Sequence, residues 1–272
     1  MKSFMKIELK RAFHNTSFFI VLGITMGICI WHFVQNVWIW RDYVYAGSYP
    51  LSAFGNGKWI GGDNASLQPT LYFLILPILC SIPYGKTFYF DIKSGFMDQL
   101  ITRGKKKEYL AAKFIVAFVS GAVISVLPLL FDFLLTGTIL PAIIPQRGMG
   151  IFPITDGDLM AGLFYTNPYL YLILYLLLDA VFFGLMNIIA IWAVNFVSNG
   201  FWIVLMPFLS YLFVFCMLQF VDQERFAPIA FLRPSQPFQS EGKIVCVELV
   251  ILILLNIIFY FWHLKKERIN YE

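Results

Sequence analysis

Charged residues are scarce in this chain. Only 13% of its 272 residues are Asp, Glu, Lys or Arg, while 59% are hydrophobic and the mean hydropathy is +0.73. A soluble globular domain normally carries about twice that share of charge. The scarcity therefore excludes such a domain as the main part of the chain. It predicts an integral membrane protein with a single transmembrane domain over residues 1–272.

Motifs for catalysis, metal binding and nucleotide binding are also missing. The four cysteines form no C-x-x-C pair and fall in or beside apolar runs, which is typical of small core residues. The three histidines are scattered, so no metal site is expected. No G-x-x-x-x-G-K-[ST] motif is present, because Gly57-Lys58 lacks the earlier glycine and Trp59 follows it. We expect neither an enzyme nor a bound cofactor, and no nucleic-acid partner.

Long apolar runs dominate what is there. Six stretches reach the roughly 20 residues that a membrane-spanning helix needs. They cover residues 18–40, 69–88, 109–135, 168–195, 201–220 and 244–264. The sequence therefore predicts an all-α protein with six transmembrane helices. Pro77 and Pro83 are expected to kink the second span.

Lysine and arginine are unevenly distributed between the two sides of the predicted spans. If the N-terminus lies inside, fourteen of the 20 fall on the inner side. Positive charge is retained in the cytoplasm, so both termini are expected there, in a cell membrane of bacterial type. Residues 1–13 lack the apolar core and cleavage site of a signal peptide, so no cleaved leader is expected.

The first 15 residues mix apolar and basic side chains. Apolar residues such as Phe4 and Ile7 alternate with basic residues such as Lys6 and Lys10. This pattern predicts a short amphipathic elbow helix suited to anionic headgroups. A frayed basic tail is the alternative, because the helix is short. Before the last span, residues 226–233 are apolar but too few to cross, which predicts a short re-entrant or interfacial segment on the outer side.

A strongly basic, polar segment separates the second and third predicted spans, over residues 88–113. Its apolar residues recur at the spacing of one helical face: Ile92, Phe96, Met97, Leu100 and Ile101. Arg103-Gly104 then forms a typical helix end. The pattern predicts a short amphipathic helix over residues 91–103, which either grips lipid or fits into a soluble partner protein.

The same segment contains an acidic residue, a glycine, a spaced leucine and an arginine, followed by an aromatic-Leu-Ala-Ala-Lys run. These positions are Asp91, Gly95, Leu100, Arg103 and 109–113. The pattern resembles the region after the second span in type-2 ABC transporter permeases, where Glu usually stands at the position of the acid. Predicted span number, orientation, elbow helix and last outer loop extend the resemblance over most of the chain.

The resemblance implies the permease subunit of an ABC exporter. In that family the segment is the coupling helix, which docks on a cytosolic ATPase chain that holds ATP and Mg²⁺. Two ATPase chains and a second permease, identical or different, are the implied partners, together with membrane lipid. The implied coupling residues are Asp91, Gly95, Phe96, Met97, Asp98, Leu100 and Arg103.

The cargo path lies between the two permeases in the resembled family and is lined by the second and fifth spans. The candidates at those positions are Phe73, Phe208, Tyr211 and Phe215. With little soluble length for a vestibule, an amphipathic or hydrophobic cargo is favoured. A peptide or bacteriocin comes first, then a drug, lipid or polysaccharide.

Two acidic residues fall inside predicted spans, where an acid is costly and usually faces the bundle interior. Asp179 lies near mid-membrane, and a structural hydrogen bond to Asn187 or to another span is favoured over proton relay or cargo contact. Asp132, near the outer end of its span, is expected to be solvated. An ion-coupled secondary transporter, supported by Asp179, is one alternative function. A membrane-embedded enzyme is the other, although the spans carry no paired acids or Ser/Lys arrangement.

Overall fold

The structure, a computed structural model, describes residues 2–45, 52–54, 57–97, 99, 106–143, 154–155, 157–236 and 238–266. All regular structure in these ranges is helical, which confirms the all-α class. The helices are α1 Lys2–Phe13, α2 Thr16–Asn36, α3 Arg41–Tyr45, α4 Leu67–Ser81, α5 Thr87–Lys93, α7 Lys106–Gly137, α8 Ala161–Thr166, α9 Pro168–Ala193, α10 Gly200–Phe220, α11 Pro228–Leu232 and α12 Gly242–Lys266. Short 3-10 helices cover Trp38–Trp40 and Glu224–Phe226.

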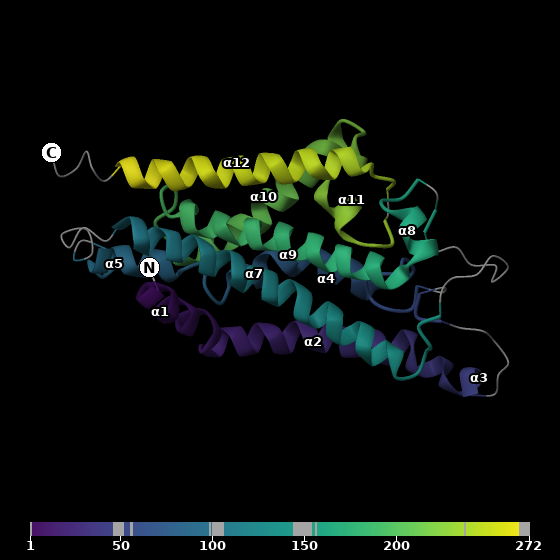
Figure 1. The fold of residues 1–272 in the computed structure, drawn as a ribbon. Coiled ribbons are helices and arrows are strands. Elements are labelled where there is room, and N and C mark those ends of the chain that lie inside the picture. The colour runs from purple at the N-terminus through teal and green to yellow at the C-terminus, as the bar shows by residue number, and fades with distance from the viewer. Residues whose placement is uncertain are drawn as a thin grey trace.

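Five helical stretches in the described ranges are long and apolar enough to cross a membrane, which supports the predicted membrane protein. They are Thr16–Trp40, Lys106–Gly137, Pro168–Ala193, Gly200–Phe220 and Gly242–Lys265. They run side by side along the long axis of the molecule, with α4 among them (Figure 1). Helices α1 and α5 lie at one end, where α12 also ends, and α3 and α8 lie at the other (Figure 1).

The predicted second span is not one continuous helix. Helix α4 has 15 residues and ends at Ser81, so at about 1.5 Å per residue it is shorter than a bilayer core of about 30 Å. Pro77 is accommodated inside α4, whereas the chain turns at residues 82–86 before α5 begins. At Gly85 a Cβ atom would lie 2.7 Å from the Ser81 carbonyl oxygen and 2.9 Å from Ala190 Cβ, so only glycine fits this turn.

Helices α7 and α9 form the centre of the bundle. In the most apolar 18-residue stretch of each helix, 50% of α7 and 61% of α9 is buried within the chain. The two helices approach closely because Gly121 faces Gly184, where a Cβ on Gly121 would lie 2.7 Å from the Phe183 carbonyl oxygen. Small residues at a helix crossing allow this backbone approach in membrane proteins.

Helices α10 and α12 form the rim. Only 17% and 11% of the residues in the most apolar stretches of α10 and α12 are buried, so most of their surface lies on the outside of the chain. Cys216 and Cys246 lie on this exposed surface, whereas Cys29 and Cys80 are buried, and all four thiols are free. The prediction that all cysteines are core residues is therefore wrong for two of them. The apolar segment before α12 contains the short helix α11, whose side chains pack inward.

The glycine contact between α7 and α9 gives a stability prediction. Gly121→Ala places a methyl group against backbone and should destabilise the protein by about 1–3 kcal/mol, as overpacking typically does. Gly23→Ala on α2 is the matched control, because nothing lies within 4 Å of its new Cβ. Thermal unfolding in detergent measures both. Equal melting temperatures for the two variants would contradict the close approach.

Candidate functional site

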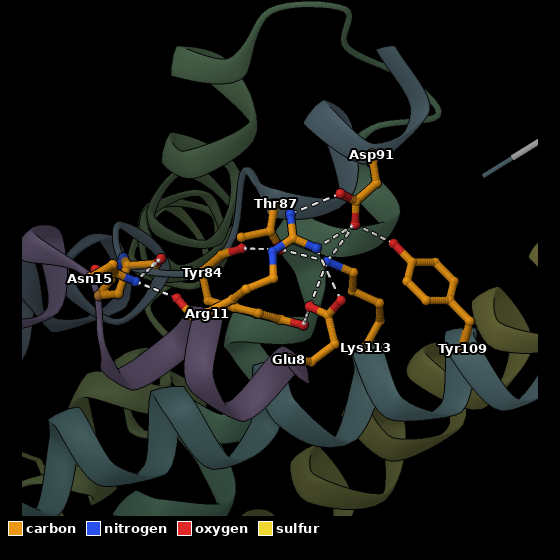
Figure 2. Close-up of polar contacts among 9 residues, drawn as sticks. Glu8, Arg11, Asn15, Tyr84, Thr87, Asp91, Tyr109 and Lys113 are labelled. Carbon is orange, nitrogen blue, oxygen red and sulfur yellow. Dashed lines mark hydrogen bonds and ion pairs between the residues drawn. The ribbon is translucent and has the colours of Figure 1, made fainter. Parts of the chain in front are cut away.

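Four charged side chains meet where α1, α5 and α7 join, and we call them the charge cluster (Figure 2). Glu8 and Arg11 come from α1, Asp91 from α5 and Lys113 from α7. Lys113 Nζ lies 2.9 Å from Glu8 Oε2 and 2.7 Å from Asp91 Oδ2. The Arg11 guanidinium donates two hydrogen bonds to Asp91, of 3.0 and 2.8 Å, and one of 3.0 Å to Glu8. Two cations and two carboxylates therefore balance.

Neutral groups complete the charge cluster. The Tyr84 hydroxyl donates to Glu8 Oε2 at 2.7 Å, and the Tyr109 hydroxyl donates to Asp91. Lys113 Nζ donates to Thr87 Oγ1 at 3.1 Å and also lies over the rings of Tyr84 and Tyr109. Lys113 is fully buried and Asp91 is 5% exposed. Burial of charges is tolerated here because each has a partner of opposite sign.

The corner between α1 and α2 places α1 against the rest of the cluster. The Asn15 side chain accepts a hydrogen bond of 2.7 Å from the Phe18 N–H and so caps α2. Its amide nitrogen donates to the carbonyl oxygens of Arg11 and Pro83, at 2.6 and 3.1 Å. Ala12 is fully buried, so its small side chain lets α1 lie close to its neighbours. The corner is thereby fixed to the turn that precedes α5.

Asp91 and Arg11 stay ionised at neutral pH. Burial alone would raise the pKa of the Asp91 carboxyl, but the hydrogen bond from Arg11 and the charge of Lys113 outweigh it and the pKa is lowered. Burial alone would lower the pKa of Arg11, but the hydrogen bond to Asp91 and the charge of Glu8 outweigh it and the pKa is raised. Because the Asp91 pKa is depressed, its contribution to stability is present at neutral pH and is lost only in acid.

The predicted coupling residues divide into three groups. Asp98, Leu100 and Arg103 lie outside the described residues. Asp91 points into the charge cluster and Met97 is 3% exposed, so neither presents the open docking surface that the helical pattern suggested. Gly95 adopts a left-handed conformation with φ of 71° just after α5, and Phe96 remains 38% exposed.

Exposed apolar side chains lie on the outer side of α5. Phe90 is 49% exposed and Ile92 41% exposed. A groove of about 400 Å³ lies between α5 and the start of α10, with Lys86 and Phe90 on one side and Phe201 on the other. The exposed apolar surface therefore includes α5 and the start of α10, which is wider than the predicted helix alone.

A second polar cluster lies at the opposite end of the bundle, and the sequence did not reveal it. His32 Nδ1 is 3.2 Å from Asp132 Oδ1, and His32 Nε2 is 3.2 Å from Asp63 Oδ2. Asp132 is fully buried and also accepts a 2.7 Å hydrogen bond from the Ile60 N–H. The expectation that Asp132 is solvated is therefore wrong. Since each ring nitrogen of His32 faces a carboxylate, the site suits an imidazolium that donates to both.

Asp179 lies in the interior of α9 without the predicted partner. It is 1% exposed, and its Oδ1 has no hydrogen-bond partner among the described residues. Asn187 instead donates to the Ala117 carbonyl oxygen at 2.7 Å, so the predicted hydrogen bond between Asp179 and Asn187 is wrong. The Tyr211 hydroxyl, on α10, is likewise buried and has no partner within the described ranges.

The predicted path residues lie at different depths. Phe73 on α4 and Tyr211 on α10 are buried within the chain, at 1% and 2% exposure. Phe208 and Phe215 on α10 are half-buried. Of the four, only Phe208 and Phe215 reach the surface of the chain.

Known proteins give no direct guide to the activity of this chain. No family model, no curated protein and no solved structure matches it. In the part of the chain that the structure describes, no group of three or more His, Cys, Asp or Glu side chains is placed to hold a metal ion.

The charge cluster gives a second stability prediction. Lys113→Met leaves Glu8 and Asp91 buried beside a single cation, which should destabilise the fold by about 3–5 kcal/mol. Lys107→Met, at an exposed position on the same helix, is the control and should change stability by less than about 0.5 kcal/mol. Thermal unfolding in detergent measures both variants. Adding Asp91→Asn to Lys113→Met should recover part of the loss, and no recovery would argue against direct pairing.

Proposed function

We propose that the chain is the permease subunit of an ATP-driven ABC exporter. It works as a pair with a second permease, identical or different, and with two cytosolic ATPase chains that hold ATP and Mg²⁺. The observation that carries the proposal is the contact of Asp91 with Tyr109 and Lys113. These three residues belong to the pattern that resembles the family, and Asp91 opens the segment expected to dock on the ATPase.

The charge cluster supports a route for transmitting ATPase motion. Separating Asp91 from Arg11 or Lys113 would leave buried charges unpaired, so α1, α5 and α7 move together. A displacement of α5 is therefore transmitted to α2 through the hydrogen bond of Asn15, at the corner between α1 and α2, to the Pro83 carbonyl oxygen. It reaches α9 through the glycine contact with α7. The exposed Phe90 and Phe96 are the side chains on which an ATPase cleft acts.

Membrane topology completes the proposal. Helix α4 and the turn after it make the sixth crossing, and both termini lie in the cytoplasm of a bacterial cell. The weakly buried surfaces of α10 and α12 leave ample apolar area for a second permease and for lipid. Phe208 and Phe215 then border a path for amphipathic or hydrophobic cargo. A peptide or bacteriocin is favoured, ahead of a drug, lipid or polysaccharide.

Asp179 favours a second candidate function. A buried carboxyl group with an unpaired oxygen in a membrane helix marks a proton or ion pathway by default. The unpaired hydroxyl of Tyr211 is also buried, on the neighbouring helix α10. An ion-coupled secondary transporter would use this acid to bind and release a proton. It would need no ATPase partner, which separates the two candidates experimentally.

The exporter proposal predicts that the purified chain has negligible ATPase activity and captures a cognate ATPase chain. Phe96→Ala should weaken this capture about tenfold, because a buried aromatic anchor typically carries much of an interface's energy. Phe220→Ala is the matched control, since Phe220 is 88% exposed at the C-terminal end of α10. Pull-down affinity measures both. Steady ATP hydrolysis by the contaminant-free chain, or unchanged capture by the Phe96 variant, would refute the proposal.

Asp179→Asn distinguishes the two candidates. If ATP drives transport, this variant should retain most transport in proteoliposomes with the ATPase chain, since Asn keeps a polar side chain without the charge. If a proton gradient drives transport, the variant should abolish gradient-driven cargo movement. Tyr211→Phe serves as the control, because it removes the other unpaired polar atom without removing an ionisable carboxyl group. If a proton gradient drives transport by the unaltered chain and Asp179→Asn abolishes that transport, the secondary transporter is favoured.

A further inference from the structure

The charges of α1 are divided between two faces of the helix. Glu8 is the only acid on α1, and it points into the charge cluster together with Arg11 (Figure 2). Lys2, Lys6 and Lys10 are exposed. They recur every four residues, so they lie in one row along the helix. The exposed lysines of α1 are therefore not balanced by any exposed acidic residue on the same helix.

An apolar row lies beside the lysine row. Met5, Leu9 and Phe13 follow the same four-residue spacing and are half-buried. The two rows line a groove of about 680 Å³ along the helix, into which His14 also projects. The groove thus has a positively charged edge and an apolar floor, which matches an amphiphile with a negative headgroup.

The position of α1 fixes which amphiphile can reach the groove. Only His14 and Asn15 separate α1 from α2, which opens a stretch of 25 residues that is long and apolar enough to cross a membrane. A helix with lysines on one side and apolar residues beside them, joined so directly to a spanning helix, is placed to lie along the membrane surface. Lysine stems can extend along apolar surface while their ammonium groups reach the headgroups.

We propose that this groove binds an anionic phospholipid. One acyl chain lies along Met5, Leu9 and Phe13, and the phosphate headgroup contacts Lys2, Lys6 and Lys10. The lipid then holds α1 from the membrane side while the charge cluster holds it from the protein side. The proposal does not depend on whether the protein is an exporter.

Lipid binding to the purified full-length chain tests the proposal. Phosphatidylglycerol and phosphatidylcholine with identical acyl chains are titrated in detergent, and native mass spectrometry gives the apparent affinity for each. Phosphatidylglycerol should bind at least about tenfold more tightly, because each lysine near the surface adds about fivefold in attraction to anionic lipid. Lys6→Gln should lower this preference about fivefold. The combined change of Lys2, Lys6 and Lys10 to Gln should abolish it.

A control with equal charge loss separates a site from general electrostatics. Lys86, Lys93 and Lys107 are also exposed lysines in the part of the chain near α5, and changing all three to Gln should leave the preference intact. Leu9→Ser should weaken binding of both lipids, because it disrupts the apolar floor. Melting curves confirm that each variant is folded.

Three outcomes would overturn the proposal. The first is equal affinity of the unaltered chain for the two lipids, and the second is an equal loss of preference in the control variant. The third is a lysine-row variant that keeps its preference for phosphatidylglycerol but loses capture of the ATPase chain. That result would make this face of α1 a protein-docking surface.

Discussion

The buried ammonium group of Lys113 is the constraint on which this end of the structure depends. A cation removed from water needs carboxylates close by, and Glu8 and Asp91 supply them from two different helices. Since these carboxylates also need compensation, Arg11 pairs with both. The arrangement fixes the positions of α1, α5 and α7 together, because moving any one of them leaves an unpaired charge in a low-dielectric environment.

Packing carries this constraint into the rest of the bundle. Helix α7 presents Lys113 to the charge cluster and Gly121, two turns further on, to α9. At its far end Asp132 pairs with His32 of α2. One helix thus makes polar contacts near both ends and a tight glycine contact between them. This explains why α7, unlike α12, is extensively buried within a single chain.

Sequence reasoning found the parts that depend on local composition. Long apolar runs without charge predicted the spanning helices, and five of the six predicted stretches correspond to helices of spanning length in the described residues. The early end of α4 was missed because the turn that follows it depends on a distant contact: at Gly85 the backbone packs so closely against Ala190, more than a hundred residues later, that no side chain fits there. The hydrogen bond expected between Asp179 and Asn187 failed because eight residues separate them along one helix, about 12 Å.

Pairings between distant residues were not visible in the sequence. Lys113 was counted as one of many cytoplasmic cations, and nothing local joins it to Glu8. A signal did exist: a lysine only a few residues into a long apolar run requires a carboxylate partner, and Tyr109 lies on the same face one turn earlier. His32 gave no comparable signal, since a lone histidine in an apolar helix is uninformative until Asp63 and Asp132 are placed beside it.

The break between α4 and α5 separates two segments with different kinds of contact. The turn after Ser81 belongs with α1, because Tyr84 binds Glu8 and the Pro83 carbonyl oxygen binds Asn15. Helix α4 packs against α2, α7, α9 and α10, and at its end the Ser81 hydroxyl donates to the Val204 carbonyl oxygen of α10 at 2.5 Å. Neither α4 nor α10 contains a charged residue. Movement of this pair against the ionic half of the bundle would therefore separate no ion pair. It would instead break neutral hydrogen bonds, such as those from Tyr72 to the Ser125 carbonyl oxygen and from Gln68 to Gln35.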